Sequence, residues 1–207
     1  MRLGIFGGTF DPVHYAHLLL AERCREQCRL DRVIFVPAAV PPHKLGQALT
    51  PGSVRVEMLR LAIAGHEKFT ISTSEVDRGG VNYTIDTLRG FRQSEADAEL
   101  FFLLGADMLH DLPNWREVER VCEMATIVAV RRVGSPEPDF ACLAHLVSEE
   151  RIERFRQHAV EMPAMGLSGT EIRRRVRAGL SIRYMTPRAV EKFIETHGLY
   201  RTDATPG

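Results

Sequence analysis

The sequence has no excess of charge of either sign and no long apolar segment. Its 207 residues include 27 Lys and Arg and 27 Asp and Glu, so the formal net charge is zero. A balanced charge argues against a protein that binds nucleic acid over its whole surface, although it leaves room for a local basic site. Apolar runs such as Leu18–Ala21 and Ile127–Val130 are far shorter than the roughly 18 residues of a membrane span. We therefore expect neither a nucleic-acid partner nor a membrane partner.

The sequence also lacks a secretory signal and a cysteine motif. Glycines and Asp11 follow the short apolar stretch Leu3–Phe6 at once, which is not the pattern of a signal peptide. No Cys-x-x-Cys pair is formed by the cysteines, which are Cys24, Cys28, Cys122 and Cys142. Cys24 and Cys28 are four residues apart, but without a second pair a zinc site is the weaker interpretation and buried or idle thiols the stronger. These features predict a cytoplasmic protein with reduced thiols.

Short apolar segments with the character of buried strands alternate with helical patterns along the chain. The expected strands are Leu3–Phe6, Val33–Val36, Phe69–Ser72, Leu100–Leu104, Thr126–Val130 and His158–Met162. The expected helices start near Tyr15 and Thr84 or cover Ser53–Ala64, Ser168–Ala178 and Pro187–His197. Near-continuous apolar strands that alternate with helices are typical of a parallel sheet covered on both faces.

The chain contains no internal repeat and no linker rich in Gly or Ser. We therefore predict a single α/β domain over residues 1–207, with a doubly wound, Rossmann-like parallel sheet, helices on both faces and a frayed tail at 202–207. In such folds the ligand binds beyond the carboxyl ends of the strands, near the point where the strand order reverses. A ligand site is expected there.

A glycine-rich turn follows the first expected strand and begins the sequence GGTFDPVHYAH at Gly7. It matches neither the dinucleotide fingerprint GxGxxG nor a Walker loop, which disfavours a dinucleotide-dependent dehydrogenase. Glycines nonetheless allow backbone to approach phosphate, and the helix that follows directs its first N–H groups to the same place. His14 and His17 are three residues apart and share a helix face, where two imidazoles suit phosphate oxygens or a metal ion. The alternative is a pair of ordinary polar residues, but their position directly after a strand and a Gly-Gly turn favours phosphate.

A second phosphate-binding pattern lies near the carboxyl end, in the sequence LSGTEIRRR that begins at Leu167. Ser168 is a natural N-cap, and Glu171 three residues later predicts a capping box. Hydroxyl groups and unpaired N–H groups at a helix start suit phosphate, and Arg173 can reach back over that turn as a fixed cation. The alternative is a capped helix with a solvated basic face, which is our interpretation of Arg174, Arg175 and Arg177.

His-x-x-His after Gly-Gly-Thr-Phe-Asp-Pro, joined to Ser-x-Thr-x-x-Arg late in the chain, resembles the HxGH nucleotidyltransferase superfamily and, within it, the bacterial nicotinate-nucleotide adenylyltransferases. Further matches follow in the same order at Val36–Lys44, Asn82–Leu88, Gly105–Asp107, Asn114–Trp115 and Gly198–Arg201. The resemblance covers essentially the whole chain. Two positions depart from the family pattern, since Ala16 stands where Gly is usual and Gly169 where Ser is common.

The resemblance implies adenylyl transfer from ATP to nicotinate mononucleotide, which yields deamido-NAD and pyrophosphate and belongs to NAD biosynthesis. The nucleophile would be a substrate phosphate oxygen that is already anionic at neutral pH, so no general base and no covalent intermediate are required. Catalysis would consist of positioning and of neutralising the triphosphate charge. Mg²⁺ is expected as a cofactor carried by ATP and water, without a protein metal site, and a homo-oligomer remains open.

The same resemblance assigns roles to individual residues. The catalytic groups about the ATP phosphates would be His14, His17, Lys44 and Arg173. The other ATP contacts would be Gly7, Gly8, Thr9, Phe10, Gly105, Asp107, Ser168 and Thr170. Nicotinate mononucleotide would be bound by Tyr83, Thr84 and Trp115.

Several of these residues also have a plainer interpretation. Lys44 alone would be a surface lysine, and a lone tryptophan such as Trp115 is usually part of a core. Asp107 would cap a short helix over Met108–His110, which from the residues alone is as good an interpretation as a contact with ribose. A helix start at Thr84 would leave unpaired N–H groups at the positive end of the helix dipole, which suits a carboxylate.

Other functions compete with this one. A pantetheine-phosphate adenylyltransferase shares the phosphate-binding residues but is typically shorter and lacks the Tyr-Thr and Trp elements, and a nicotinamide-mononucleotide enzyme belongs to the same superfamily. A non-catalytic, nucleotide-binding regulatory module would keep Gly105 and Asp107 but would not need the charge-neutralising set, which is complete here. A fragment of a class I aminoacyl-tRNA synthetase is disfavoured because the Lys-Met-Ser-Lys-Ser loop and a tRNA domain are missing.

Overall fold

Six parallel strands form the centre of the computed structural model, which describes residues 1–42, 46 and 48–201. The strands are β1 (Arg2–Gly8), β2 (Arg32–Pro37), β3 (Phe69–Ile71), β4 (Glu99–Gly105), β5 (Ala125–Arg132) and β6 (Val160–Met162). They lie in the order β3-β2-β1-β4-β5-β6, and every neighbouring pair is parallel. The chain builds outward from β1 to β3 and then returns to the other side of β1, so the strand order reverses between β1 and β4.

The side chains of each strand alternate between two apolar cores, one on each face of the sheet. On β1, Leu3 and Ile5 belong to one core and Phe6 to the other. Gly4 faces the same core as Phe6. A Cβ atom on Gly4 would lie 2.7 Å from Leu30, so glycine allows the Leu30 side chain to pack directly on the strand. Because both faces are buried, the strands are apolar throughout, which is why the sequence pattern identifies them.

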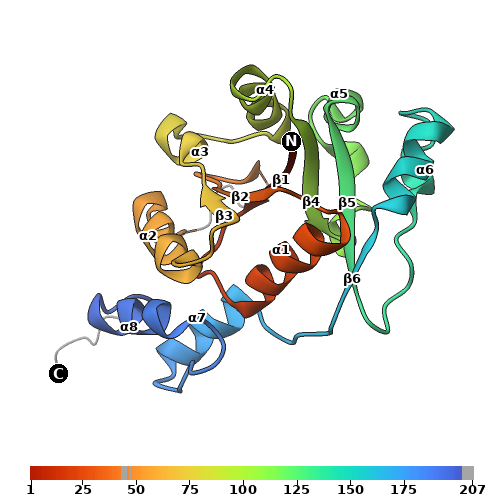
Figure 1. The fold of residues 1–207 in the computed structure, drawn as a ribbon. Helices are drawn as coiled ribbons and strands as arrows, with labels where there is room; N and C mark the ends of the chain where they lie inside the picture. Colours follow the sequence, from red (N-terminus) through yellow and green to blue (C-terminus); the bar gives the residue numbers. More distant parts are fainter. Residues whose placement is uncertain (43–45, 47, 202–207) are drawn as a thin grey trace.

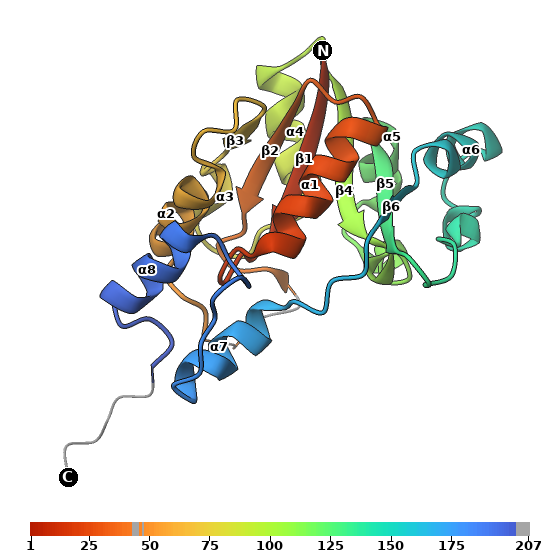
Figure 2. The same ribbon diagram turned by 60° about the horizontal axis from the view of Figure 1, so that its bottom comes forward.

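Helices cover both faces of the sheet (Figure 1). The core that contains Phe6 includes side chains from α1 (Tyr15–Gln27), α2 (Gly52–Ile63) and α8 (Arg188–Thr196). The core on the other face includes side chains from α4 (Thr84–Ser94), α5 (Val118–Met124) and α6 (Glu149–Gln157). The remaining helices are α3 (Ser74–Arg78) and α7 (Gly169–Arg177). Figure 2 shows α7 at the end of the sheet to which the strand arrows point.

The predicted doubly wound parallel sheet is confirmed, with every expected strand present. The three helices expected at Ser53–Ala64, Ser168–Ala178 and Pro187–His197 are confirmed to within one residue at each end. The sixth strand begins at Val160 and not at His158, because His158 ends α6, where its Nδ1 lies 2.8 Å from the carbonyl oxygen of Arg154.

The sequence pattern does not predict α3, α5 or α6. In α6 only Ile152 and Phe155 are buried, so the apolar stripe is too short to be distinguished from a polar loop. Such short helices depend on packing against the rest of the fold. No helix in the described residues is both long and apolar enough to cross a membrane. Lys44 and the expected tail at 202–207 lie outside the described residues.

Candidate active site

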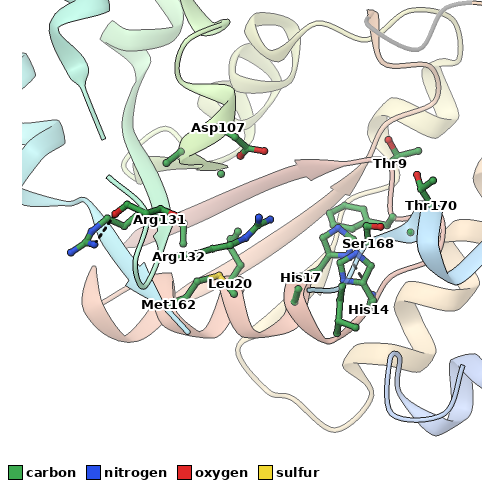
Figure 3. Close-up of a pocket in the computed structure, with 18 of the residues that line it drawn as sticks. Thr9, His14, His17, Leu20, Asp107, Arg131, Arg132, Met162, Ser168 and Thr170 are labelled. Carbon is green, nitrogen blue, oxygen red and sulfur yellow. Dashed lines mark hydrogen bonds between the residues drawn. The ribbon is translucent and has the colours of Figure 1, made fainter. Parts of the chain in front are cut away.

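A cavity of about 690 Å³ lies beyond the carboxyl ends of β1 and β4, where the strand order reverses (Figure 3). Its walls come from the loop after β1, the start of α1, the turn after β4, the loop after β5 and the start of α7. The residues singled out from the sequence that line it are Thr9, Phe10, His14, His17, Gly105, Asp107, Ser168, Thr170 and Arg173. The volume is in the range that binds a nucleotide-sized ligand.

The loop after β1 turns sharply at Phe10. The φ angle of Phe10 is 50°, in the left-handed region that few residues other than glycine adopt, and its side chain is buried. A Cβ atom on Gly8 would lie 2.9 Å from the Phe10 ring, so glycine at this position makes room for the turn. Gly7 and Gly8 end β1 and are not among the residues that line the cavity. Gly8 therefore shapes the loop, while the packing around Gly7 does not require glycine.

His14 and His17 form a stacked pair at the start of α1. His14 is the N-cap residue, and its backbone N–H donates a hydrogen bond to Nδ1 of His17 at 3.3 Å. The two ring centroids lie 3.7 Å apart with an interplanar angle of 20°. Because Nδ1 of His17 accepts a hydrogen bond, the neutral ring carries its proton on Nε2. The helix start thereby presents an imidazole N–H donor.

Burial determines the charge of His14. Only 5% of the residue is exposed, and this burial lowers the pKa of the imidazole to about 4. Nδ1 of His14 is closed to solvent and has no hydrogen-bond partner in the described part of the chain. His14 is therefore neutral at pH 7. His14 can therefore serve the site as a hydrogen-bonding group and not as a cation.

The start of α7 forms another wall of the cavity, and Figure 3 shows Ser168 beside the two histidines. Ser168 is the N-cap residue, and its Oγ accepts a hydrogen bond from the N–H of Glu171 at 3.1 Å. The carboxylate of Glu171 binds the guanidinium of Arg174 through two contacts of 2.7 Å. The predicted capping box is therefore only half formed, because Glu171 is engaged by Arg174.

Arg173 is held against the backbone of the loop after β1. Its Nη1 donates to the carbonyl oxygen of Asp11 at 2.6 Å, and its Nη2 donates to Oγ1 of Thr170 at 3.4 Å. Gly169 permits this approach, since a Cβ atom there would lie 2.7 Å from the same carbonyl oxygen. The guanidinium is thus a fixed cation in the cavity wall, with further N–H groups left for a ligand.

The turn after β4 folds the carboxylate of Asp107 back over Gly105. Gly105 is the N-cap of a short 3₁₀ helix, η2 (Ala106–Met108), and a Cβ atom on Gly105 would collide with Oδ1 of Asp107. Asp107 lies inside this helix and not before it, so the expected cap of a helix over Met108–His110 is wrong. The carboxylate is exposed, and Figure 3 shows it across the cavity from Thr170.

Tyr83, Thr84 and Trp115 do not line this cavity. The predicted helix start is confirmed, since α4 begins at Thr84 with Tyr83 as its N-cap. Tyr83 and Trp115 pack against the same core, and the guanidinium of Arg116 lies 4.9 Å from the centre of the Tyr83 ring. Trp115 is half-buried and contacts the ring of Phe102 on β4 edge-on at 5.8 Å. The structure therefore places these residues in a second group on one face of β4.

Arg55 is the largest side chain buried near the site, and the sequence reasoning missed it. It is 1% exposed and donates hydrogen bonds to three carbonyl oxygens, those of Thr9 at 2.7 Å, Thr50 at 2.8 Å and Ala39 at 3.2 Å. Burial lowers the pKa of its guanidinium from the usual value. Arg55 thus joins the loop after β1 to the backbone at Ala39 and at Thr50. An arginine on an amphipathic helix carries no sequence signal for such a role.

The end of β5 adds two arginines, Arg131 and Arg132, which were not selected from the sequence because the fifth strand was expected to end at Val130. Arg131 bridges Glu137 at 2.8 Å and Glu161 at 2.5 Å. Arg132 is exposed and lines the same cavity, and within the described residues it forms no ion pair. Figure 3 shows Arg132 between Leu20 and the loop after β5, so it adds a free positive charge to this side of the cavity.

The donor set of the cavity suits an anion better than a metal ion. Among the described residues, no group of three or more His, Cys, Asp or Glu side chains is placed to hold a metal. Burial raises the pKa of the Cys28 thiol to about 11 and that of Cys122 to about 12, so neither is a reactive thiolate at neutral pH. Imidazole, hydroxyl and guanidinium donors at two helix starts are the groups that bind phosphate oxygens.

Comparison with known proteins gives a consistent picture. The family model described as cytidylyltransferase-like matches residues 5–175. A protein of Thermus thermophilus with the curated name "Probable nicotinate-nucleotide adenylyltransferase" is 48% identical over 97% of this chain and 100% of its own length. A protein of Thermomicrobium roseum with the same name is 46% identical over 97% of this chain and 92% of its own.

The fold is also shared with solved structures. The nicotinic acid mononucleotide adenylyltransferase of Plasmodium falciparum complexed with NaAD superposes with a TM-score of 0.75, covering 96% of this chain and 97% of that one. The sequence identity is 18%, so this likeness concerns the fold alone.

Proposed function

The chain belongs to the cytidylyltransferase-like family, and on that premise we propose that it is a nicotinate-nucleotide adenylyltransferase. It transfers the adenylyl group of ATP to nicotinate mononucleotide, releases pyrophosphate and forms deamido-NAD in NAD biosynthesis. The structural observation that carries the proposal is the meeting of two helix starts, those of α1 and α7, at one cavity where the strand order reverses. Backbone and side-chain donors at helix starts are suited to a triphosphate.

The reaction makes one phosphorus–oxygen bond and breaks another. A phosphate oxygen of the mononucleotide attacks the α-phosphorus of ATP, and the bond from that phosphorus to the bridging oxygen of the pyrophosphate breaks. The attacking oxygen is anionic at neutral pH, so no residue has to remove a proton from it. The protein instead aligns the two substrates and offsets the charge that grows on the departing pyrophosphate.

His14, His17 and Arg173 are proposed to contact the triphosphate. His17 would donate from Nε2, because its Nδ1 already accepts the N–H of His14. Arg173 would supply a fixed positive charge, since its guanidinium is anchored on Asp11. As a neutral imidazole, His14 would orient phosphate oxygens by hydrogen bonding without the desolvation cost of a buried charge.

The rest of the ATP site is proposed to follow the cavity walls. Ser168 and Thr170 would bind phosphate oxygens at the start of α7, and Asp107 would accept hydrogen bonds from a ribose hydroxyl beside Gly105. Thr9 and Phe10 would form the wall after β1, in the loop that Gly8 helps to shape. Lys44, from the loop after β2, would add a second cation.

Nicotinate mononucleotide is proposed to bind toward the group formed by Tyr83, Thr84 and Trp115. At the start of α4 the first backbone N–H groups have no partner within the helix and lie at the positive end of its dipole, which suits the nicotinate carboxylate. The half-buried indole of Trp115 offers an aromatic face for the pyridine ring.

A divalent cation fits this site as part of the substrate. The carboxylates that line the cavity, such as Asp107 and Asp139, form no metal-ligand cluster within the described residues, so the ion would be held by phosphate oxygens and water. We propose Mg²⁺, which keeps several waters and is commonly bound through substrate phosphates. It would supply charge neutralisation on the triphosphate when bound.

A pyrophosphate-release assay with ATP and a panel of acceptors tests the function. We expect release with nicotinate mononucleotide, less with nicotinamide mononucleotide and none with 4′-phosphopantetheine, with deamido-NAD identified as the product. Release with 4′-phosphopantetheine alone would assign the chain to the pantetheine-phosphate branch. Nucleotide binding without release in any mixture would favour a regulatory module.

A further inference from the structure

The loop between β1 and α1 is tied down by residues from the last part of the chain. The backbone N–H of Tyr15 donates to the carbonyl oxygen of Met185 at 3.2 Å, and the carbonyl oxygen of Val13 accepts a hydrogen bond from Oγ1 of Thr186 at 2.7 Å. Both Val13 and Thr186 are buried. The carboxyl-terminal segment therefore supplies hydrogen bonds that a loop of this kind cannot make within itself.

Asp11 is the centre of these contacts. The hydroxyl of Tyr200 donates to Oδ1 of Asp11 at 2.6 Å, and the N–H of Thr50 donates to Oδ2 at 3.2 Å. The backbone carbonyl oxygen of Asp11 accepts a hydrogen bond from the guanidinium of Arg173. Asp11 is only 6% exposed, so its carboxylate depends on these partners for the hydrogen bonds that water would otherwise supply.

Tyr200 is built to remain a donor to this carboxylate. Burial and the neighbouring charge of Asp11 raise the pKa of its phenol, so the hydroxyl keeps its proton at neutral pH. Its backbone has a φ of 64°, in the left-handed region that is unfavourable for a large side chain. The tertiary structure holds it there, although Tyr200 is not among the residues that line the cavity.

We propose that Tyr200 is a positioning residue for the triphosphate, acting through Asp11 on the loop that carries Thr9, Phe10 and His14. The inference rests on the proposed adenylyl transfer, and it assigns a function to a segment beyond residues 5–175, which the family model matches. Loss of the hydroxyl leaves the Asp11 carboxylate with one hydrogen bond fewer in a buried site, and the loop relaxes. A displacement of about 1 Å in a catalytic group can cost roughly a hundredfold in rate.

The test compares Tyr200→Phe with Tyr184→Phe. Tyr184 has the same φ of 64° but is 79% exposed, so its variant controls for removing a phenol hydroxyl from this backbone conformation. We expect Tyr200→Phe to lower kcat/KM for ATP roughly 10- to 100-fold and to weaken binding of inorganic tripolyphosphate in calorimetry. The KM for nicotinate mononucleotide should stay within about twofold, because its proposed site lies elsewhere, and such a split distinguishes positioning from a general loss of structure.

Asp11→Asn and the double variant complete the experiment. If the hydroxyl acts through Asp11, the double variant is no worse than the more impaired single variant, whereas additive losses would overturn the inference. Should Tyr200→Phe fail to fold, a folded Asp11→Asn protein with wild-type ATP kinetics and tripolyphosphate affinity would overturn it as well. If the wild-type protein shows no adenylyl transfer, the proposed function is wrong. Tripolyphosphate binding then still tests the role of Tyr200. Weaker binding by Tyr200→Phe than by the wild type supports that role, and unchanged binding overturns it.

Discussion

A Cβ atom on Gly169 would lie 2.7 Å from the carbonyl oxygen of Asp11. The first residue of α7 therefore packs directly on the backbone of the loop after β1, at the point where Arg173 also binds that carbonyl oxygen. This contact sets how closely the two helix starts approach across the cavity.

Replacement of Gly169 by alanine is expected to move the start of α7 away from Asp11. Overpacking against backbone costs about 1–3 kcal/mol of folding free energy, and the displaced Arg173 should lower kcat/KM for ATP by roughly tenfold. The matched control is Gly166→Ala, because a Cβ atom there has no neighbour within 4 Å. Denaturant unfolding and steady-state kinetics on both variants check this, and equal behaviour of the two would refute the role of the contact.

His17→Ala is expected to remove most turnover while the protein stays folded. Loss of one donor to developing charge costs on the order of 10²–10³ in rate. The exposed His145, which is not among the residues that line the cavity, supplies the control His145→Ala. Near wild-type kcat in a folded His17→Ala protein would contradict the assignment of His17 to the triphosphate.

Arg173→Lys keeps the charge but loses the planar guanidinium that binds Asp11 and Thr170 together. We expect a loss of roughly tenfold or more in kcat/KM for ATP, because lysine cannot make both contacts and still face the ligand. Arg177→Lys, on the exposed side of the same helix, should be neutral. If lysine at position 173 restores full activity, Arg173 acts only as a positive charge.

His14 should make the folded protein less stable in mild acid. Burial lowers the pKa of His14 to about 4 from 6.5, so between these values the unfolded chain binds a proton that the folded protein does not. The protonation of His14 therefore does not reduce the free energy of unfolding above pH 6.5. As the pH falls from 6.5 toward 4, the free energy of unfolding decreases by about 3 kcal/mol at most, at 1.36 kcal/mol per pH unit.

Comparison with His14→Asn isolates this effect from the titration of carboxylates. Unfolding free energies measured in urea at several pH values should converge between wild type and His14→Asn as the pH falls from 6.5 to 4. The exposed His145→Asn variant should instead follow the wild-type curve. Parallel curves for wild type and His14→Asn would show that His14 does not resist protonation in the folded protein.

The acid substrate should be preferred over the amide. The start of α4 at Thr84 offers backbone donors, which pair with the nicotinate carboxylate but face the NH₂ group of nicotinamide. An unpaired buried donor costs about 1–3 kcal/mol, so we expect at least a roughly tenfold higher kcat/KM for nicotinate mononucleotide. Equal values for the two mononucleotides under one set of conditions would indicate a dual-specificity enzyme, with adenylyl transfer itself unaffected.

Much of the fold follows from signals that lie within a few residues of each other. A strand buried on both faces must be apolar along its length, so Leu100–Leu104 is recognisable without any partner. The helix start after Ser168 follows from the capping preference of hydroxyl side chains, since the first N–H groups of a helix need acceptors nearby. The start of α4 at Thr84 is marked by the apolar spacing of Ile85 and Leu88, while its N-cap, Tyr83, makes no side-chain cap hydrogen bond. The grouping of these turns at one end of the sheet follows from parallel strands, whose carboxyl ends share an edge.

The short helices cannot be predicted from such local signals, because packing against the rest of the fold stabilises them and their sequences show no clear periodicity. In α5 the buried Val118, Val121 and Cys122 form the only apolar stripe, which spans little more than one turn. Asp107 shows the same limit at the site, since its place inside η2 depends on how β4 ends and not on its neighbours in sequence.

The sequence by itself determined the strands, most of the long helices and the two glycine- and serine-marked turns, because each depends on contacts between close neighbours. Only the tertiary structure decided that Arg55 is buried under three carbonyl oxygens, that Tyr200 binds Asp11 and that His14 is neutral. Burial and hydrogen-bond pairing are set by atoms from segments that are remote in sequence, and no local pattern specifies which remote segment will supply them.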